Sequence, residues 1–296
     1  FVMAGGVWWS ERTAMVSPEE GREIVIETTI DRNSVRLILG DNQMIPLTSK
    51  HEVAILNTKG ILHSEGLRTL NYTYVKRDSL ENVSEYHTLI VPKGERQKVI
   101  FSDSSWVVLN AQSTMKYPVV FRGKERKVYV EGEAYFEVTR DEKYPFVVSV
   151  KNFDVRVLGT SFNVMSYDDE FASSVTLLSG KVETTSGHDT VRLSPGEQVS
   201  ITSDNRMTVQ KTDINVVVSW MDGKFGFSNE RLDVIMRKIC RWYDVEVLYA
   251  VPGIRERRFT GAPASNMPLK ELLEALSTTT NLQFSLQDGV ITIKQN

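Results

Sequence analysis

The chain has 296 residues, which predicts two or three domains, because a typical domain has on the order of 150 residues. Hydrophobic residues make up 41% of the chain and charged residues 25%, as in soluble globular proteins. The formal net charge of −3, with no long run of one sign, argues against a nucleic-acid-binding surface, which needs a basic patch. The single cysteine, Cys240, excludes a disulfide within the chain and is predicted to be a buried hydrophobic residue, not a nucleophile.

The first nine residues are apolar and contain two adjacent tryptophans, Trp8 and Trp9. This run is too short for a membrane span, which takes roughly 20 residues, but it fits the last turns of one, where tryptophans collect at the membrane interface. A tag remnant or an unstructured terminus explains the same composition equally well. Because the chain begins at Phe1, we expect a processed product or a fragment, with residues 1–20 as a juxtamembrane or flexible segment.

From Arg22 to about Ile214 the sequence predicts short strands and turns. The clearest strand is Val128–Val138, where small and apolar residues alternate with polar and aromatic ones over eleven positions. Gly132 at its centre predicts a bulge or a bend. Many short strands with regular turn signals indicate an all-β region, either a sandwich or a solenoid-like coil of β-turns.

A weak internal repeat supports the β interpretation. Residues 35–47 can be laid over residues 97–109 with Asp41 on Asp103, and the apolar positions then coincide on both sides of the turn. Both segments read as strand, polar turn and strand, so the sequence predicts one hairpin design used twice, although hairpins also share such patterns by chance.

After Trp220 the pattern predicts a small α+β module. Ser228 and Asn229 are N-cap residue types, and apolar residues then recur at helical spacing up to Tyr243. A second helix is predicted after Pro268. The predicted order is β-α-β-β-α-β-β, with residues 224–227 as the first strand, which corresponds to two βαβ units side by side.

No constellation of residues predicts a reaction, a cofactor or a metal. The four histidines are scattered without metal-ligand spacing. The acidic cluster Asp168, Asp169 and Glu170 has the chemistry to bind calcium or act as a carboxylate pair, but such clusters are more often solvated turns. The tryptophans Trp106, Trp220 and Trp242 are predicted to be core or domain-junction anchors.

Seven segments carry a more specific signal through their order and density. These segments are Val91–Glu95, Phe101–Ala111, Arg126–Val138, Pro145–Val148, Val157–Val164, Leu177–Val182 and Leu193–Gln198. In this order they resemble the FecR family of anti-sigma regulators, in the form common in Bacteroidetes-type bacteria. Residues 220–227 and 241–245 resemble the family's C-terminal companion domain, which is similar to the short N-terminal domain of secretins and TonB-dependent transporters. The chain departs from the family at residues 101–105, which lack the glycine of the usual leucine-proline-aspartate-glycine-serine turn.

The resemblance implies a periplasmic sensor anchored to the inner membrane by a segment outside this chain. Such a protein relays a signal from the N-terminal signalling domain of an outer-membrane TonB-dependent transporter to an extracytoplasmic-function sigma factor. Together with the charge and the residue inventory, it leads us to expect no enzymatic activity, no cofactor, no metal and no nucleic acid. The expected domains are an N-terminal β region at 21–90, a FecR-like all-β domain at 91–214 and the C-terminal α+β domain at 215–296.

The residues predicted to bind a partner lie on a charged strand of the C-terminal domain, because a charged edge strand can pair selectively with a partner strand. They are Arg255, Arg257, Arg258 and Phe259, although a plain solvated strand is the commoner explanation of such a charged segment. Two other functions remain open. A carbohydrate-binding or adhesive β module predicts exposed coplanar rings on one sheet face, and a glycosidase-like enzyme predicts two carboxylates, with Asp168 or Glu170, converging in a cleft.

Overall fold

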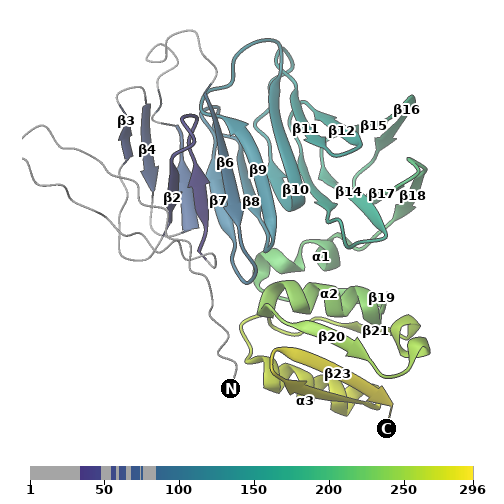
Figure 1. Cartoon of the computed structure of the whole chain (residues 1–296). Coiled ribbons are helices and arrows are strands. Elements are labelled where there is room, and N and C mark those ends of the chain that lie inside the picture. The colour runs from purple at the N-terminus through teal and green to yellow at the C-terminus, as the bar shows by residue number, and fades with distance from the viewer. Residues whose placement is uncertain are drawn as a thin grey trace, which may run out of the picture. The chain divides into compact units, whose positions relative to one another are not determined.

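The computed structural model describes residues 34–47, 55–57, 60–64, 68–73, 75 and 85–295. All of them belong to one compact unit, Asn33–Asn296. The predicted juxtamembrane segment 1–20, with Trp8 and Trp9, lies outside the described residues. The structure confirms a mainly β fold followed by a small α+β part (Figure 1).

Two sheet layers form the β region, and neighbouring strands are antiparallel except for the pairs β10–β11 and β5–β7. In the first layer the strands follow the order β2 (Met44–Pro46), β1 (Arg36–Ile38), β6 (Tyr86–Val91), β9 (Ser113–Pro118), β10 (Arg126–Glu137), β11 (Phe146–Val150), β12 (Phe153–Val157), β15 (Val182–Ser186) and β16 (Asp189–Leu193). In the second layer the order is β3 (Ile55–Asn57), β4 (Gly60–Ser64), β5 (Thr69–Asn71), β7 (Gln97–Ile100), β8 (Trp106–Leu109), β10, β13 (Ser161–Ser166), β14 (Ala172–Ser179), β17 (Glu197–Thr202) and β18 (Met207–Lys211).

Strand β10 belongs to both layers because it bends at its centre. Its first half pairs with β9 in the first layer, and Ala134–Glu137 pairs with β8 in the second. The bend falls at Gly132, which has a φ of 96°, and an added Cβ there would lie 2.7 Å from the Cα of Ser113. Only glycine fits this conformation and this close approach, so the predicted bend is confirmed.

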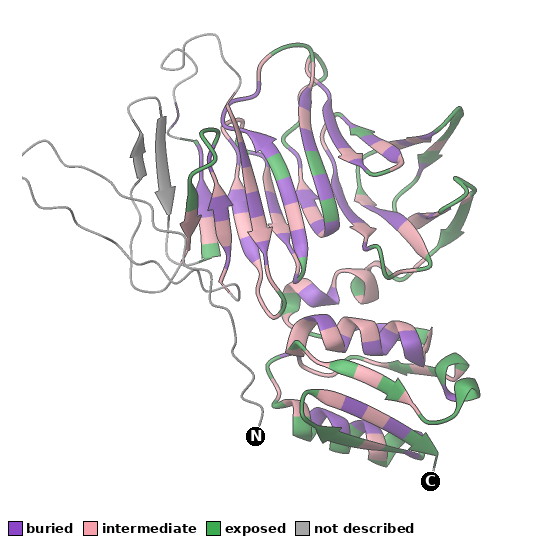
Figure 2. Cartoon of the chain, in the orientation of Figure 1, coloured by how far each residue is buried: buried purple, intermediate pink, exposed green. Residues whose placement is uncertain are grey.

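One apolar core fills the space between the layers. It takes Leu89 and Val148 from the first layer and Val107 and Val175 from the second, all fully buried (Figure 2). The alternation predicted for Val128–Val138 is confirmed, because its apolar side chains face this core. The two layers sharing one core correspond to a sandwich.

The second half of the β region also has a coil-like feature. Successive hairpins alternate between the layers: β11–β12 lies in the first, β13–β14 in the second, β15–β16 in the first and β17–β18 in the second. The chain crosses between layers at residues 158–160, 180–181 and 194–196. The predicted sandwich therefore describes the two layers, and the predicted coil describes the path of the chain between them.

The predicted sequence repeat is a structural repeat. The segments 35–47 and 97–109 each form a hairpin whose turn is closed by the same two backbone hydrogen bonds. In the first turn Leu39 N donates to Gln43 O (2.9 Å) and Asn42 N to Leu39 O (3.0 Å), and in the second Phe101 N donates to Ser105 O (2.8 Å) and Ser104 N to Phe101 O (3.0 Å).

The aspartates of the two turns also play the same part. Asp41 and Asp103 each accept a backbone N–H two residues on, and the residues that follow them, Asn42 and Ser104, have φ of 66° and 67°. Ser104 therefore takes a left-handed conformation at the position where the FecR turn has glycine. Asp103 is further held by the buried guanidinium of Arg126 at 2.6 Å.

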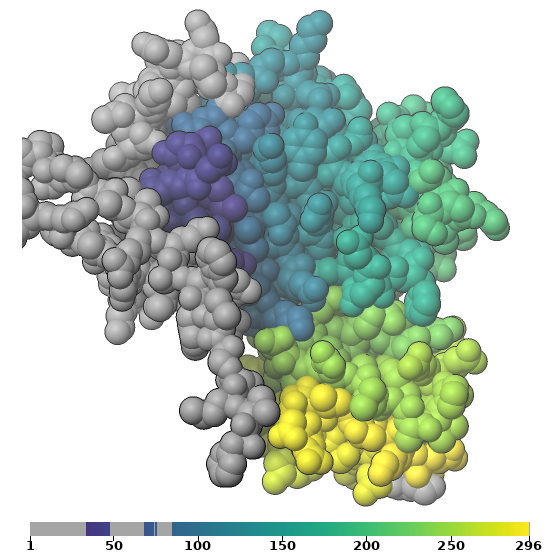
Figure 3. Space-filling view, in the orientation of Figure 1, coloured from purple at the N-terminus to yellow at the C-terminus, as the bar shows by residue number. Residues whose placement is uncertain are grey.

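The C-terminal module, residues 224–295, has its own apolar core, built from Leu232, Met236, Leu272, Ile291 and their neighbours. Figure 3 shows its chain, coloured from green to yellow, packed as one body. Its elements are β19 (Phe227–Arg231), α2 (Leu232–Tyr243), β20 (Glu246–Tyr249), the 3₁₀ turn η4 (Pro252–Glu256), β21 (Arg258–Gly261), α3 (Leu269–Thr280), β22 (Leu282–Gln287) and β23 (Val290–Gln295), after α1 (Ile214–Val217) and the 3₁₀ turn η3 (Ser219–Asp222).

The predicted order of elements in the module is confirmed, but the first strand is Phe227–Arg231 and not residues 224–227. The strand pairing also differs from that of simple βαβ units. The strands that flank α2 lie in different sheets, because β19 pairs with β21 and β20 pairs with β23. The strands that flank α3 are likewise separated, with β22 paired to β23. The module therefore holds a two-stranded sheet β19–β21 and a three-stranded sheet β20–β23–β22.

The predicted start of the first helix is wrong. Ser228 and Asn229 lie in β19, and α2 begins at Leu232 after an Arg231 that provides no side-chain cap. Pairing with β21 extends the strand past the two cap-type residues, and Asn229, with a φ of 47°, sits where the register of that pairing shifts. Strand pairing has overridden the local capping preference.

Candidate functional site

The β region and the C-terminal module are joined by charged and aromatic side chains, three of which come from α2. We call this contact the module junction and define it by Arg96, Tyr167, Asp169, Glu170, Trp220, Arg237, Arg241 and Trp242. The apolar face of α2 packs into the module core, and the opposite face supplies Arg237 and Arg241.

Arg241 is at the centre of the module junction. Its guanidinium binds the carboxylates of Glu170 and Asp169, the latter at 2.8 Å, and lies 3.9 Å from the centre of the Tyr167 ring. Burial alone would lower the pKa of Arg241, but the Glu170 carboxylate and Tyr167 more than offset it, so the pKa is raised above the ordinary value. Arg241 therefore remains charged while only 7% of its side chain is exposed.

The acidic cluster is not the solvated turn that the sequence predicts. The side chain of Glu170 is only 6% exposed and is shared by Arg241 and Arg237, the latter donating from Nε at 2.8 Å. Asp169 is half exposed and also bound to Arg241, and only Asp168, 88% exposed and 3.0 Å from Lys151, fits the prediction. The prediction of a solvated turn fails because Arg241, which binds Asp169 and Glu170, lies about seventy residues along the chain, and local composition does not reveal it.

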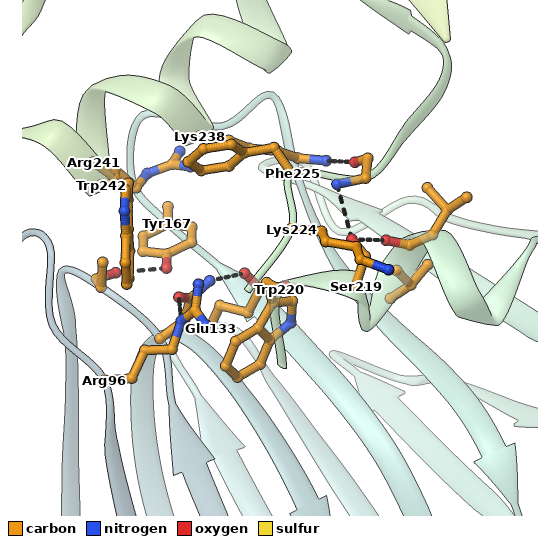
Figure 4. A pocket seen from close by; sticks show the side chains of 15 residues that line it. Arg96, Glu133, Tyr167, Ser219, Trp220, Lys224, Phe225, Lys238, Arg241 and Trp242 are labelled. Atoms are coloured by element: carbon orange, nitrogen blue, oxygen red, sulfur yellow. Dashed lines mark hydrogen bonds between the residues drawn. The ribbon is translucent and has the colours of Figure 1, made fainter. Parts of the chain in front are cut away.

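Arg96 forms a second contact, between two tryptophans. Its guanidinium carbon lies 4.3 Å from the Trp242 ring centre and 5.7 Å from that of Trp220 (Figure 4). Trp220 donates from Nε1 to Asn163 at 3.3 Å, and Trp242 donates to the Ser265 carbonyl at 2.7 Å. Burial lowers the pKa of Arg96. Trp220 and Trp242 thus lie at the junction, as the sequence predicts.

The C-terminal end of α2 is also tied to the loop before β7. Gly94 N donates to the Arg241 carbonyl at 3.1 Å, and Lys93 pairs with Asp244 at 2.8 Å. Gly94 has a φ of 75°, and an added Cβ would lie 2.9 Å from the Trp242 carbonyl oxygen. This approach requires glycine, which explains one position of the Val91–Glu95 segment.

A small cavity of about 50 Å³ lies within the module junction, bordered by Arg96, Glu133, Tyr167, Trp220 and Arg241 (Figure 4). Glu133, the carboxylate among these residues, accepts hydrogen bonds from Asn163 (3.0 Å) and Asn110 (2.8 Å). Burial raises the pKa of Tyr167, whose hydroxyl donates to the Ala111 carbonyl at 2.7 Å. Glu133 and Tyr167 are therefore already hydrogen-bonded within the β region.

The four residues predicted to bind a partner do not all lie on one strand. Arg258 and Phe259 are in β21, which pairs only with β19 among the described residues, whereas Arg255 is on the turn η4. Arg255 lies 4.6 Å from the Tyr249 ring centre, and Arg257 donates to the Thr280 carbonyl at 3.1 Å. Arg258 is exposed and donates to the Asn229 carbonyl at 2.7 Å, while Phe259 packs against the module core.

Few features of the described residues favour a carbohydrate-binding module or a glycosidase-like enzyme. Trp106 and Tyr135 lie together on the outside of the second layer, but their ring planes meet at 42°, so they are not coplanar. Asp169 and Glu170 are neutralised by arginines. Within the described residues, no group of three or more His, Cys, Asp or Glu side chains is placed to hold a metal ion. Cys240 is partly buried and not fully buried as predicted, and burial raises its pKa to about 11.

The fold defines a class of protein: a β-sandwich followed by an α+β module, joined through buried charges. The family model described as "FecR protein" matches residues 87–183, and that described as "FecR, C-terminal" matches residues 224–293. Together the two models cover more than half of the chain, so the chain belongs to the FecR family, as the sequence segments predict.

Solved structures support the same assignment. Two crystal structures of a proposed anti-sigma factor from Parabacteroides distasonis, at 1.65 and 2.50 Å resolution, are similar to this chain. Each is 29% identical, with 71% of this chain and 99% of the other covered, at a TM-score of 0.66. No curated protein shows significant sequence similarity to the chain. Within the described ranges, no helix is long and apolar enough to cross a membrane.

Proposed function

We propose that the chain is the periplasmic sensor part of a membrane-anchored anti-sigma regulator. In this proposal it relays a signal from an outer-membrane TonB-dependent transporter to an extracytoplasmic-function sigma factor through contacts between folded surfaces. Membership of the FecR family and the similarity to the Parabacteroides protein support a regulatory role. The sigma factor and the inner membrane would be reached through segments outside this chain.

The C-terminal module is the proposed receiver of the signal. It has a core of its own and an edge strand, β21, with one neighbour among the described residues. Backbone N–H and C=O groups on such an edge can pair with a strand of a partner, and the exposed Arg258 would select an acidic one. The resemblance of this module to the N-terminal domains of secretins and transporters supports the transporter's signalling domain as its partner.

The single observation that carries the proposal is the way the receiver is attached. An independent apolar core is joined to the β region chiefly by ion pairs and cation–π contacts of Arg96, Arg237 and Arg241. Polar interfaces within a chain resemble transient protein interfaces, so binding at the module can shift the junction between two states.

Calorimetry tests the proposal directly. The full chain is titrated with the signalling domain of the TonB-dependent transporter encoded nearest to it in the genome, and saturable binding is expected. Arg258→Glu should weaken binding at least tenfold, because it reverses a charge on the proposed edge. The matched control is Arg192→Glu on β16, whose side chain is also exposed, at 82%. Absence of binding, or equal effects of the two variants, would contradict the proposal.

A further inference from the structure

A second, larger cavity lies between the outer face of the second sheet layer and the C-terminal module. Its volume is about 520 Å³. Its floor is formed by β13, β14, β17 and β18, and its other walls by α1, β19 and α2. This volume falls in the range of small-molecule sites, which often lie between domains. We call it the junction cleft.

The floor of the junction cleft is a row of neutral polar side chains set by strand register. Asn163 pairs with Thr176, Thr176 with Gln198, and Gln198 with Gln210, so the four lie side by side across four strands. Their sequence neighbours Val175, Leu177 and Val199 point into the core, so the polar side chains face outward. Ser174, two residues from Thr176, lies on the same outer face.

Much of the hydrogen-bonding capacity of this floor is unused. Among the described residues, the side chains of Ser174, Gln198 and Gln210 form no hydrogen bond with the protein, although Ser174 is only 7% exposed. The hydroxyl of Thr176 is buried without a partner. Of the side chains that line the cleft, Ser174 is buried, Gln198 is half-buried and Gln210 is exposed. A buried hydroxyl without a partner is costly, and together with the two free amides beside it, it points to a ligand with matching donors and acceptors.

Several charged groups that line the junction cleft already have partners in the protein. Glu170 binds Arg241, Glu133 accepts from Asn163, and Lys238 donates to the Gly226 carbonyl at 3.2 Å. Carboxylates and cations line the cleft in equal number, so their charges balance. A strongly charged ligand would therefore gain little, whereas neutral donors and acceptors remain available.

The opposite wall is partly apolar, with Val216 and Val217 of α1 and Val234 of α2. We propose that the junction cleft binds a small neutral polyhydroxylated ligand, a mono- or disaccharide, in contact with both the β region and the module. Its hydroxyls would bond to Ser174, Gln198 and Gln210, and its C–H faces would pack on the valines. This mode uses amides and not stacked rings, so it does not require the coplanar aromatic platform discussed above.

The test is saturation-transfer difference NMR on the full chain with a panel of neutral mono- and disaccharides, followed by titration of the strongest binder. We expect saturable binding and a change in tryptophan fluorescence, because Trp220 donates to Asn163 in the floor. Gln198→Ala combined with Gln210→Ala should weaken binding roughly tenfold or more through two lost neutral hydrogen bonds. The control is Gln287→Ala, an exposed glutamine on β22.

Two outcomes would overturn the proposal. One is the absence of saturable binding by every sugar of the panel, and the other is equal binding by the double variant and the control. Melting temperatures of both variants within a few degrees of the unmodified chain confirm that they fold. The sugar titration contains no transporter domain and changes Gln198 and Gln210 only, so its outcome is distinct from that of transporter binding, although Arg258 of β21 also borders the cleft.

Discussion

Replacing Glu170 by glutamine should loosen the module junction. Its carboxylate binds Arg241 through Oε1 and Arg237 through Oε2, and only 6% of the side chain is exposed. Removing one member of a buried ion pair costs about 3–5 kcal/mol, because the remaining charge stays buried without compensation. Asp169 still binds Arg241 at 2.8 Å in the variant, so we place the loss at the lower end, about 3 kcal/mol.

Urea unfolding followed by tryptophan fluorescence measures this loss, because Trp220 and Trp242 report on the junction. The matched control is Asp168→Asn in the same acidic cluster. Asp168 is 88% exposed and, among the described residues, pairs only with Lys151, so its replacement should change stability by about 0.5 kcal/mol or less. A Glu170→Gln variant within about 1 kcal/mol of the unmodified chain would refute the reasoning that the junction depends on this buried pair.

Three further predictions concern the backbone and pH. Ser104→Gly should raise the free energy of unfolding by about 0.5–1 kcal/mol, since it removes a side chain from a left-handed position, whereas Ser102→Gly, whose φ is not positive, should give no gain in the same urea assay. Gly94→Ala should lower the free energy of unfolding by about 2 kcal/mol, which is more than Gly123→Ala should. Both glycines have a positive φ, but only at Gly94 would an added Cβ meet the backbone of α2. Burial lowers the pKa of His87 from its ordinary 6.5, so on acidification the imidazole is protonated in the unfolded chain before it is protonated in the folded chain. The free energy of unfolding should therefore decline as pH falls below 6.5, and less steeply in His87→Gln; equal slopes of stability against pH in the two chains would contradict this.

The local periodicity of the sequence was sufficient to predict the regular elements. The alternation of Val128–Val138 predicts β10, and the apolar spacing around Leu232 and Leu272 predicts the faces of α2 and α3. The hairpin repeat was recognisable because Asp41 and Asp103 make the same contact with the residue two positions on, a purely local interaction. The domain boundaries proposed from the sequence, at 20, 90 and 214, remain predictions.

The features that the sequence did not predict depend on contacts between distant residues. Glu170 is buried only because Arg241, far along the chain, lies over it, and neither residue is unusual in its own segment. Ser228 and Asn229 are cap residues by composition, but pairing with β21 places them in a strand. Besides Trp220 and Trp242, a pair of arginines four apart on α2, on the face opposite its apolar stripe, is a signal that could have indicated the junction.

The junction cleft was invisible from the sequence for a related reason. Asn163, Thr176, Gln198 and Gln210 are ordinary polar residues of separate strands, and only the register of four strands aligns them. Strand register is set by the pairing of whole hairpins and not by any one segment.

Hydrogen exchange on the full chain, with and without the transporter signalling domain, tests most directly whether a surface of the module receives the signal and the junction passes it on. The account predicts new protection at Arg258–Gly261 together with changed exchange in α2 and around Glu170. Protection confined to the β region, with β21 and α2 exchanging as in the free chain, would contradict it.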